Sequence, residues 1–385
     1  MSSDGDGRPR SLGGVTDLDT FRLRATAWLD ANKVHAPRDY GAICPPDLVG
    51  AGVSWHKRLH EAGWTGLHWP VQHGGRGLTA AHNAIWMEEC ARAGVPAAFN
   101  MVGLVLAGGA LLRFGTPEQQ ARLLGPTLAA DILWCQLFSE PGAGSDLGSL
   151  TTRAERDGDR FVVNGQKVWC SGGRYSRYGI LMARTDPTLP KHRGISFFVC
   201  DMNLAGIEVR PLKQMTGDAE FDEVYFTDVG LPADALLGPL HDGWNVGMAV
   251  LTNERGHIGT AVIGLERRLD AMTHLADGRR LGPIERQGLA ELLSRGTAYK
   301  AMGQRQGPVA STNASLMKLG ITEMMFDAAV LRAGLTGADS MLEGPESFGL
   351  LQAPGGRIAG GTSQVQRNII GERLLGLARE PRSAT

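Results

Sequence analysis

The stretch 136–173 holds the residue types and spacings that are best suited to binding a ligand. It begins with Ser-Glu-Pro at 139–141 and continues into a glycine-rich turn, Gly-Ala-Gly-Ser-Asp, at 142–146. Glycine carries no Cβ, so the backbone of such a turn can approach a bulky or phosphorylated group closely. The stretch ends near Trp169 and Ser171, which offer a broad apolar plane and a hydroxyl donor. A lone Gly-Ala-Gly-Ser is more often an ordinary turn, so the prediction of a ligand site depends on the order of the whole stretch.

The middle of this stretch predicts β-structure. An alternating run at 160–163 is followed by Asn164 and Gly165. Asn-Gly between apolar alternations is the strongest short signal for a hairpin turn. We therefore expect a hairpin at this dipeptide, and we expect Trp169 and Ser171 to lie at the end of a strand.

The composition is that of a globular protein without a strongly charged surface. The chain has 385 residues, of which 43% are hydrophobic and 21% charged, enough for two or three domains. Its formal net charge is -1 and it has no long basic run, which argues against nucleic acid and anionic membranes as partners. The longest apolar run, 102–112, is too short to cross a bilayer. Residues 1–14 read as a polar, disordered lead-in without a signal core.

The cysteines and histidines do not suggest a metal site. The five cysteines are scattered and lack a Cys-x-x-Cys spacing, as expected for buried free thiols in a reducing cytoplasm. The sequence contains no dinucleotide-binding Gly-x-Gly-x-x-Gly after a strand, no P-loop and no His-Glu-x-x-His. No metal is predicted, and a cofactor has to be argued on other grounds.

Hydrophobic periodicity orders the chain as helices, then strands, then helices. Helical spacing covers 16–34, 47–62, 79–94, 97–114 and 117–129. Short apolar runs between turn signals follow from 133, and helical spacing returns at 243–271, 284–303, 309–336 and 363–377. We predict a lead-in at 1–14, an N-terminal helical domain at 15–132, a middle β domain at 133–240 and a C-terminal helical domain at 241–385. The fold class is α+β.

Three segments in this order resemble the acyl-CoA dehydrogenase family. They are the stretch 136–173, the tail Ile-Ala-Gly-Gly-Thr-Ser-Gln-Val-Gln-Arg at 358–367, and Gly-Trp-Thr-Gly-Leu-His-Trp-Pro at 63–70 with Gly-Gly-Arg-Gly at 74–77. The likeness extends over roughly residues 15–380. It implies a helical N-terminal domain, a β-barrel-like middle domain and a C-terminal four-helix bundle. It also implies FAD bound between the last two domains.

The resemblance assigns roles to the residues that match the family's motifs. Trp169 would pack on the flavin ring, and Ser171 would hydrogen-bond near flavin N5, the hydride acceptor. Ser145 would meet the pantetheine or pyrophosphate portion of the ligands. The further FAD contacts that it implies are Gln136, Phe138, Ser139, Arg279, Gly360, Thr362 and Gln364, and the substrate contacts are Ser145, Thr252 and Arg255.

The reaction that the resemblance implies is α,β-desaturation of an acyl-CoA thioester. In the family a carboxylate removes the α-proton while a hydride leaves Cβ for the flavin. Many members carry that carboxylate directly before the Gly-Thr of the tail, where this chain has Gly360. A subset carries it on the first helix of the C-terminal domain, where this chain has Glu254. The resemblance therefore predicts Glu254 as the base, and the alternative is an ordinary helix pair of Glu254 with Arg255.

Two departures from the family pattern concern assembly. The family's Arg-x-x-Phe-Gly element, whose arginine reaches the FAD of a neighbouring subunit, has Arg279 as its best substitute at a different spacing. The glycine-rich loop that covers the adenine is not evident in 341–356. The resemblance implies a homo- or hetero-oligomer, either a dimer or a tetramer, and includes mixed complexes in which only some FAD sites are complete.

The resemblance implies a cytoplasmic dehydrogenase that passes electrons to an electron-transfer flavoprotein. A base on the helix is typical of members that act on branched, long or bulky acyl groups. Two other functions stay open at this point. One is a flavin oxidase or monooxygenase on the same fold, and the other is a subunit that completes the FAD site of a partner.

Overall fold

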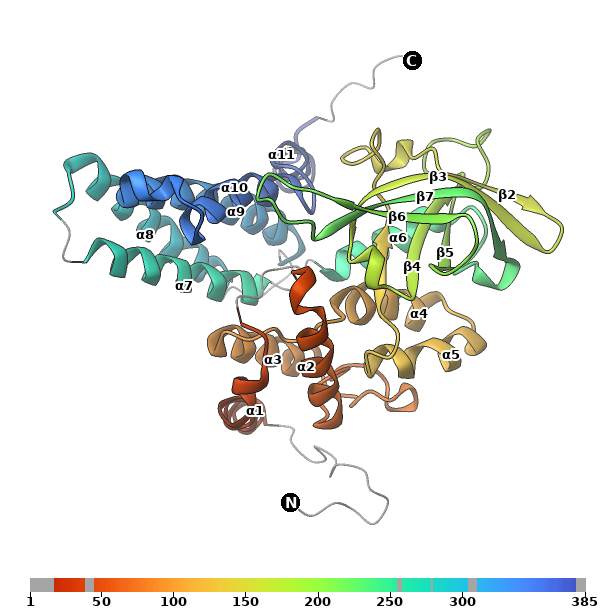
Figure 1. Cartoon of the computed structure of the whole chain (residues 1–385), viewed down its shortest axis with the longest axis horizontal. Coiled ribbons are helices and arrows are strands. Elements are labelled where there is room, and N and C mark those ends of the chain that lie inside the picture. Colours follow the sequence, from red (N-terminus) through yellow and green to blue (C-terminus); the bar gives the residue numbers. More distant parts are fainter. Residues whose placement is uncertain (1–16, 39–44, 255–257, 278–279, 304–309, 379–385) are drawn as a thin grey trace, which may run out of the picture. The chain divides into compact units, whose positions relative to one another are not determined.

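The computed structural model describes residues 17–38, 45–254, 258–277, 280–303 and 310–378. The chain divides into two units, Met1–Glu254 and Arg255–Thr385. The first unit contains N-terminal helices, a curled sheet and one further helix, and the second is helical (Figure 1). No described helix combines the length and the apolar character needed to span a membrane.

The first three helices enclose an aromatic core of their own. They are α1 (Leu18–Asn32), α2 (Val49–Glu61) and α3 (Ala80–Ala93). Asp17 caps α1, because its side chain accepts from Thr20 N at 3.0 Å. The buried rings of Trp64 and Trp86 stack nearly parallel with their centroids 4.5 Å apart, so the segment around Trp64 packs against α3.

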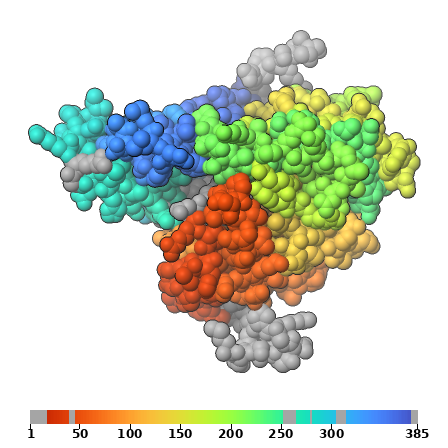
Figure 2. All heavy atoms as spheres, in the orientation of Figure 1, coloured from red at the N-terminus to blue at the C-terminus, as the bar shows by residue number. Residues whose placement is uncertain are grey.

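Two further helices cover one face of the sheet. The π-helix η4 (Val102–Ala107) runs into α4 (Gly108–Phe114), and α5 (Pro117–Leu128) follows. Figure 1 shows α4 and α5 below the sheet. Leu111 and Leu123 belong to the same buried cluster as Phe197 of the sheet. In the view of Figure 2, the N-terminal helices, from red to orange, and the sheet, from yellow to green, form one continuous surface.

The sheet has seven strands in the described part of the chain. They are β1 (Trp134–Leu137), β2 (Arg153–Asp157), β3 (Arg160–Ser171), β4 (Tyr178–Arg184), β5 (Ile195–Asp201), β6 (Ile207–Leu212) and β7 (Phe221–Pro232). The order is β1-β4-β2-β3-β7-β6, with β5 paired to β4. Adjacent residues on a strand face opposite sides, so Phe197 packs toward the helices while Phe198 belongs to a second core inside the curl. Strand β3 ends at Ser171, as predicted.

The expected hairpin at Asn164-Gly165 is wrong. These residues lie inside β3, and the turn between β2 and β3 falls at 158–159 instead. The pairing of β3 with β7 shifts register between Val163 and Gly165, which marks a β-bulge. Gly165 has a φ of 149°, and an added Cβ would meet Thr152 Oγ1 at 2.5 Å, so the bulge requires glycine. Asn-Gly suits a bulge for the same reason that it suits a turn.

Helix α6 (Gly243–Glu254) leaves the sheet and ends the first unit. Val246 and Val250, one helical turn apart, are buried in the cluster that α4 and α5 share with the sheet. A Cβ on Gly243 would meet the Ser196 carbonyl carbon at 2.3 Å, so the start of α6 lies directly on the backbone of β5. The helix that we predicted at 243–271 corresponds to α6 and α7.

The second unit is a helical bundle. Its helices are α7 (Ile258–Ala276), α8 (Pro283–Gly303), α9 (Ala310–Thr336), α10 (Pro345–Ile358), α11 (Ser363–Ile369) and the π-helix η9 (Ile370–Leu374). Leu269, Leu292 and Met324 are buried where α7, α8 and α9 meet. The helical, β and helical order confirms the predicted fold class, and the exact domain boundaries stay predictions. Most of 341–356, which we had described only as lacking an evident covering loop, forms helix α10, with Pro345 at its first position.

Candidate active site

The end of strand β3 presents Trp169 in an unusual conformation. The register with β7 shifts between Lys167 and Cys170, so the strand bulges where the tryptophan lies. Trp169 has a φ of 61°, which is uncommon for a residue with a large side chain. It is 54% exposed although its neighbours Val168 and Cys170 are buried. A backbone held in this region costs on the order of 1–3 kcal/mol, and such strain is concentrated at functional sites.

The turn after Ser171 is fixed by a buried carboxylate. Asp222 is 0% exposed and accepts from Arg174 N at 3.0 Å and from Arg174 Nε at 2.8 Å. Gly172, which directly follows Ser171 in this turn, adopts a φ of 64°. Ser171 itself is half-buried on the last position of β3. The position of its hydroxyl is therefore set by strand pairing on one side and by an ionic clamp on the other.

The segment that follows β1 lies beside this end of β3. Val168 N donates to Ser139 O at 2.9 Å, which brings Ser139 next to the residue before Trp169. The Ser139 N–H has no hydrogen-bond partner within the described part of the chain. The Phe138 ring is 3% exposed and meets the Phe197 ring edge-on at 5.6 Å, so any ligand contact from Phe138 comes from its backbone. Gln136 is half-buried on β1.

The glycine-rich turn lies open beside this segment. Glu140 and Ala143 exchange two backbone hydrogen bonds of 3.0 Å, which close the turn. Neither Gly142 nor Gly144 has a positive φ, and an added Cβ would meet no described atom within 4 Å at either one. The chain's own conformation and packing therefore do not require these two glycines. Together with the exposed Ser145, they fit a surface that a ligand approaches closely.

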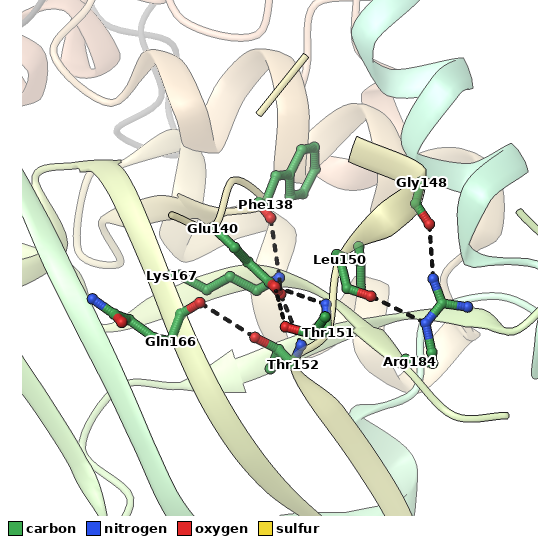
Figure 3. A network of polar contacts seen from close by, with 9 residues as sticks. All are labelled: Phe138, Glu140, Gly148, Leu150, Thr151, Thr152, Gln166, Lys167 and Arg184. Carbon is green, nitrogen blue, oxygen red and sulfur yellow. Dashed lines mark hydrogen bonds and ion pairs between the residues drawn. The ribbon is translucent and has the colours of Figure 1, made fainter. Parts of the chain in front are cut away.

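A buried ion pair joins these segments (Figure 3). Lys167 is 0% exposed, and its Nζ donates to Phe138 O at 3.0 Å and to Glu140 Oε1 at 2.8 Å. Glu140 also accepts from Thr151 N at 2.7 Å and from Thr152 N at 2.9 Å. Burial alone would raise the pKa of Glu140, but the Lys167 ammonium and the threonine donors lower it to about 2.

Lys167 and Glu140 were absent from the predicted site. One signal was available, because residues 161, 163, 165 and 167 share a face if β3 alternates strictly. A lysine on the face of Phe161 and Val163 requires a buried acid as its partner. The alternation was recognised only at 160–163, so Lys167 was not predicted to be buried.

The predicted base lies at the end of α6. Glu254 is the last residue of that helix and Thr252 lies two positions before it, and the side chains of both are outside what the structure describes. Arg255 and Arg279 lie outside the described residues as well. The helix axis is nonetheless anchored, since Val246 and Val250 are almost fully buried.

The predicted tail residues form one turn in the second unit. Gly360 and Gly361 have φ values of 64° and 94°, a conformation that suits glycine and strains any other residue. Thr362 caps α11, its Oγ1 accepting from Val365 N at 3.2 Å, and Gln364, two residues later, is exposed. Lys318 Nζ donates to Gly361 O at 2.6 Å and holds this turn against α9.

The residues of the first unit fit the flavin that the resemblance implies. Trp169 offers an exposed aromatic plane, and Ser171 and the Ser139 N–H offer donors from the adjoining strand end and loop. The open turn at Gly142 and Gly144 leaves space for a second ligand portion. A planar cofactor with polar edges needs these features together.

Comparison with known proteins agrees with this site. Three family models match the chain in order: the acyl-CoA dehydrogenase N-terminal domain over residues 32–131, the middle domain over 135–229 and the C-terminal domain over 241–375. Acyl-CoA dehydrogenase IpdE1 of Mycobacterium tuberculosis is 37% identical over 392 residues, which cover 95% of this chain and 99% of that protein.

Two solved structures share the fold over almost the whole chain. The Tcur3481-Tcur3483 steroid ACAD matches with a TM-score of 0.80 and 27% identity, covering 94% of this chain and 98% of that one. The ChsE4-ChsE5 complex from Mycobacterium tuberculosis matches with a TM-score of 0.76 and 27% identity, covering 96% and 100%. All three domains and a relative of matching length thus agree, and the chain belongs to the acyl-CoA dehydrogenase family.

Proposed function

We propose that this protein catalyses the FAD-dependent α,β-desaturation of an acyl-CoA thioester with Glu254 as the base. Its family is FAD-dependent and consists of oxidoreductases. The observation that supports a working flavin site best is the exposed Trp169 at a φ of 61° beside Ser171. A strained aromatic residue kept at the surface has a role outside the chain's own core.

Glu254 is assigned by position and by exclusion. Gly360 occupies the other place where family members carry the base, and a glycine has no side chain to accept a proton. The φ of 64° at Gly360 also disfavours a glutamate there. Glu254 ends a helix that Val246 and Val250 anchor in a buried cluster, and we assign it the removal of the α-proton. Arg255 would orient or charge-balance it.

We assign FAD contacts to residues of each unit separately. In the first unit, we assign Trp169 to the ring face, with Ser171 and the Ser139 N–H as donors at its edge. Gln136 and the Phe138 backbone adjoin them, and Ser145 meets the pantetheine or pyrophosphate portions. In the second unit, Thr362, Gln364 and the Gly360 N–H contribute. When bound, FAD accepts the hydride from the substrate Cβ.

The substrate is proposed to be the CoA thioester of a bulky, polycyclic acyl group. A structural relative is named as a steroid ACAD, at 27% identity over 94% of this chain. The helix position of the base supports the same class, because family members with that arrangement act on branched, long or bulky groups. Residues around 80–106 and 248–258 would line the acyl pocket. Thr252 and Arg255 would contact the thioester portion.

The assembly is proposed to be an oligomer, with a second type of subunit as one form. Two relatives carry names that join two components, ChsE4-ChsE5 and Tcur3481-Tcur3483. Two features favour an FAD site that one type of subunit does not complete alone. They are the unusual spacing at Arg279 and the helix α10 in the region where the family carries a loop over the adenine. A subunit that only completes its partner's FAD site is therefore the second candidate function. Electrons would pass to an electron-transfer flavoprotein, and the buried free thiols support a cytoplasmic location.

An anaerobic titration tests the proposal. The protein is purified alone and with co-expressed candidate partners, its visible spectrum is recorded, and steroid-type and straight-chain acyl-CoA thioesters are added without oxygen. Bleaching of the flavin band by a thioester supports desaturation and identifies the acyl class. A yellow protein that no thioester bleaches, or one that forms hydrogen peroxide at the rate of turnover in air, contradicts it. A chain that is colourless alone and yellow only with a partner supports the half-site subunit.

A further inference from the structure

Burial of the Lys167–Glu140 pair costs desolvation free energy, and a contribution to stability alone does not explain why the pair is there. Lys167 is 0% exposed and Glu140 is 6% exposed, so both charges have left water. Desolvation of two such charges costs several kcal/mol each, and apolar residues of similar volume often stabilise a protein equally well. Burial lowers the pKa of Lys167 and the Glu140 carboxylate opposes that shift. We take the pair as ionised because Glu140 is also held by the donors of Thr151 and Thr152.

The pair contacts backbone on both sides of the predicted flavin contacts. Lys167 Nζ donates to the carbonyl oxygen of Phe138 at 3.0 Å. Lys167 itself precedes Trp169 by two residues on β3. Glu140 binds Thr151 N and Thr152 N, which lie across the loop that carries Ser145 (Figure 3). The pair therefore links three parts of the site: the end of the loop at Thr151 and Thr152, the segment at Phe138, and strand β3, which carries Trp169.

We propose that Lys167 and Glu140 are positioning residues for the flavin, and that Lys167 strengthens the Ser139 N–H as a donor to it. The Phe138 carbonyl and the Ser139 N–H belong to one peptide group. An ammonium at that oxygen draws electron density from the nitrogen, and bonded chains of this kind polarise one another. The Ser139 N–H has no other partner in the described chain, so the strengthened donor is available to a ligand.

This inference rests on the assignment of Ser139 as a flavin contact. A stronger donor at the ring edge favours the more electron-rich reduced flavin over the oxidised form. Removal of the Lys167 charge is therefore expected to lower the preference for reduced flavin about tenfold, which for a two-electron couple corresponds to about 30 mV. A role in stability alone would leave this ratio unchanged.

Three variants separate positioning from stability. In Lys167→Met the buried Glu140 is left unpaired, so we expect a lower melting temperature together with the lower flavin potential. In the double variant Lys167→Met with Glu140→Gln, the charge imbalance is removed. The single amide oxygen can replace Oε2 as the acceptor of Thr151 N, while Thr152 N loses its acceptor, Oε1. We expect the melting temperature to recover in part and the shift in potential to persist. Glu89→Gln, which breaks an ion pair to Arg22 in the N-terminal helices, is the control that loses stability without a shift.

The readouts are the melting temperature, the visible spectrum and the flavin midpoint potential, measured on the protein alone or with the partner that it needs. A double variant with the potential and the spectrum of the wild type overturns the proposal, even if Lys167→Met alone does not fold. The potential is measured by chemical reduction and needs no substrate. A wild-type flavin that no thioester reduces therefore contradicts the proposed function while this test still decides the role of the pair.

Discussion

The indole ring of Trp169 meets the ring of Phe221 nearly at right angles, with centroids 5.6 Å apart, while 54% of the tryptophan stays exposed. Phe221 begins β7 and pairs with Ser171, and the adjoining bulge between Lys167 and Cys170 holds the exposed tryptophan. The contact orients the indole without covering it. An oriented, exposed aromatic plane is the part of the site that a ring-shaped cofactor needs, and we regard this pair as its centre.

Replacement of Trp169 by glycine tests the role of that plane. Glycine tolerates the φ of 61°, so the relief of backbone strain offsets the lost ring contact, and we expect the free energy of unfolding to change by no more than about 1 kcal/mol. We expect the flavin bound per protein, read from the visible absorbance, to fall strongly. Leu23→Ala, at a residue that is 72% exposed on α1, is the control and should keep its flavin. Full flavin content in Trp169→Gly would remove the residue from the site.

Gly243→Ala tests how α6 is seated on the sheet. An added Cβ would lie 2.3 Å from the Ser196 carbonyl carbon and 2.6 Å from Phe197 N. Both atoms belong to the backbone of β5, so the strand or the helix would have to move. We expect a loss of about 1–3 kcal/mol in the free energy of unfolding, as for other overpacked cores. Activity should fall as well, because the helix that ends at Glu254 must shift.

The matched control for Gly243→Ala is Gly264→Ala on α7. A Cβ there would meet no described atom within 4 Å, so alanine should stabilise the helix by about 0.5–1 kcal/mol. Chemical denaturation measures both variants. Equal effects of the two substitutions would contradict the close approach of α6 to β5.

His56 predicts how stability depends on pH. Its Nε2–H donates to Leu128 O at 3.0 Å, and its Nδ1 accepts from Asn100 N at 3.2 Å, so the buried ring is neutral. Burial lowers its pKa from the usual 6.5 to about 4. Above pH 6.5 neither state takes up the proton and the contribution is complete. As the pH falls toward 4 the unfolded chain is protonated first, so about 3 kcal/mol of stability is lost.

Denaturant unfolding between pH 7 and pH 4 measures this dependence. His56→Asn should be less stable at pH 7 and should lose part of the slope below pH 6.5. A slope that is the same in the variant and the wild type would show that His56 is not the group that titrates.

The features that could be predicted from the sequence are those that depend on residue type and on near neighbours in the chain. The end of β3 at Ser171 and the buried thiols of Cys90, Cys135, Cys170 and Cys200 agree with expectation. Asn164-Gly165 did not form a hairpin, because the partner strand β7 continues past it and only tertiary pairing decides between a turn and a bulge. The alternation along β3 could have indicated that Lys167 is buried, but not its partners, Glu140 and Phe138, which are 27 and 29 residues away in the chain.

The most direct test of the account is the rate of anaerobic flavin bleaching by a steroid-type acyl-CoA thioester, in the wild type and in Glu254→Gln. Rapid mixing is performed on whichever assembly holds the flavin, with matched flavin content and melting temperature as the control for folding. We predict that Glu254→Gln keeps the flavin spectrum and bleaches more slowly by about two to four powers of ten, as expected when a general base is removed. Bleaching at the rate of the wild type would show that Glu254 is not the base.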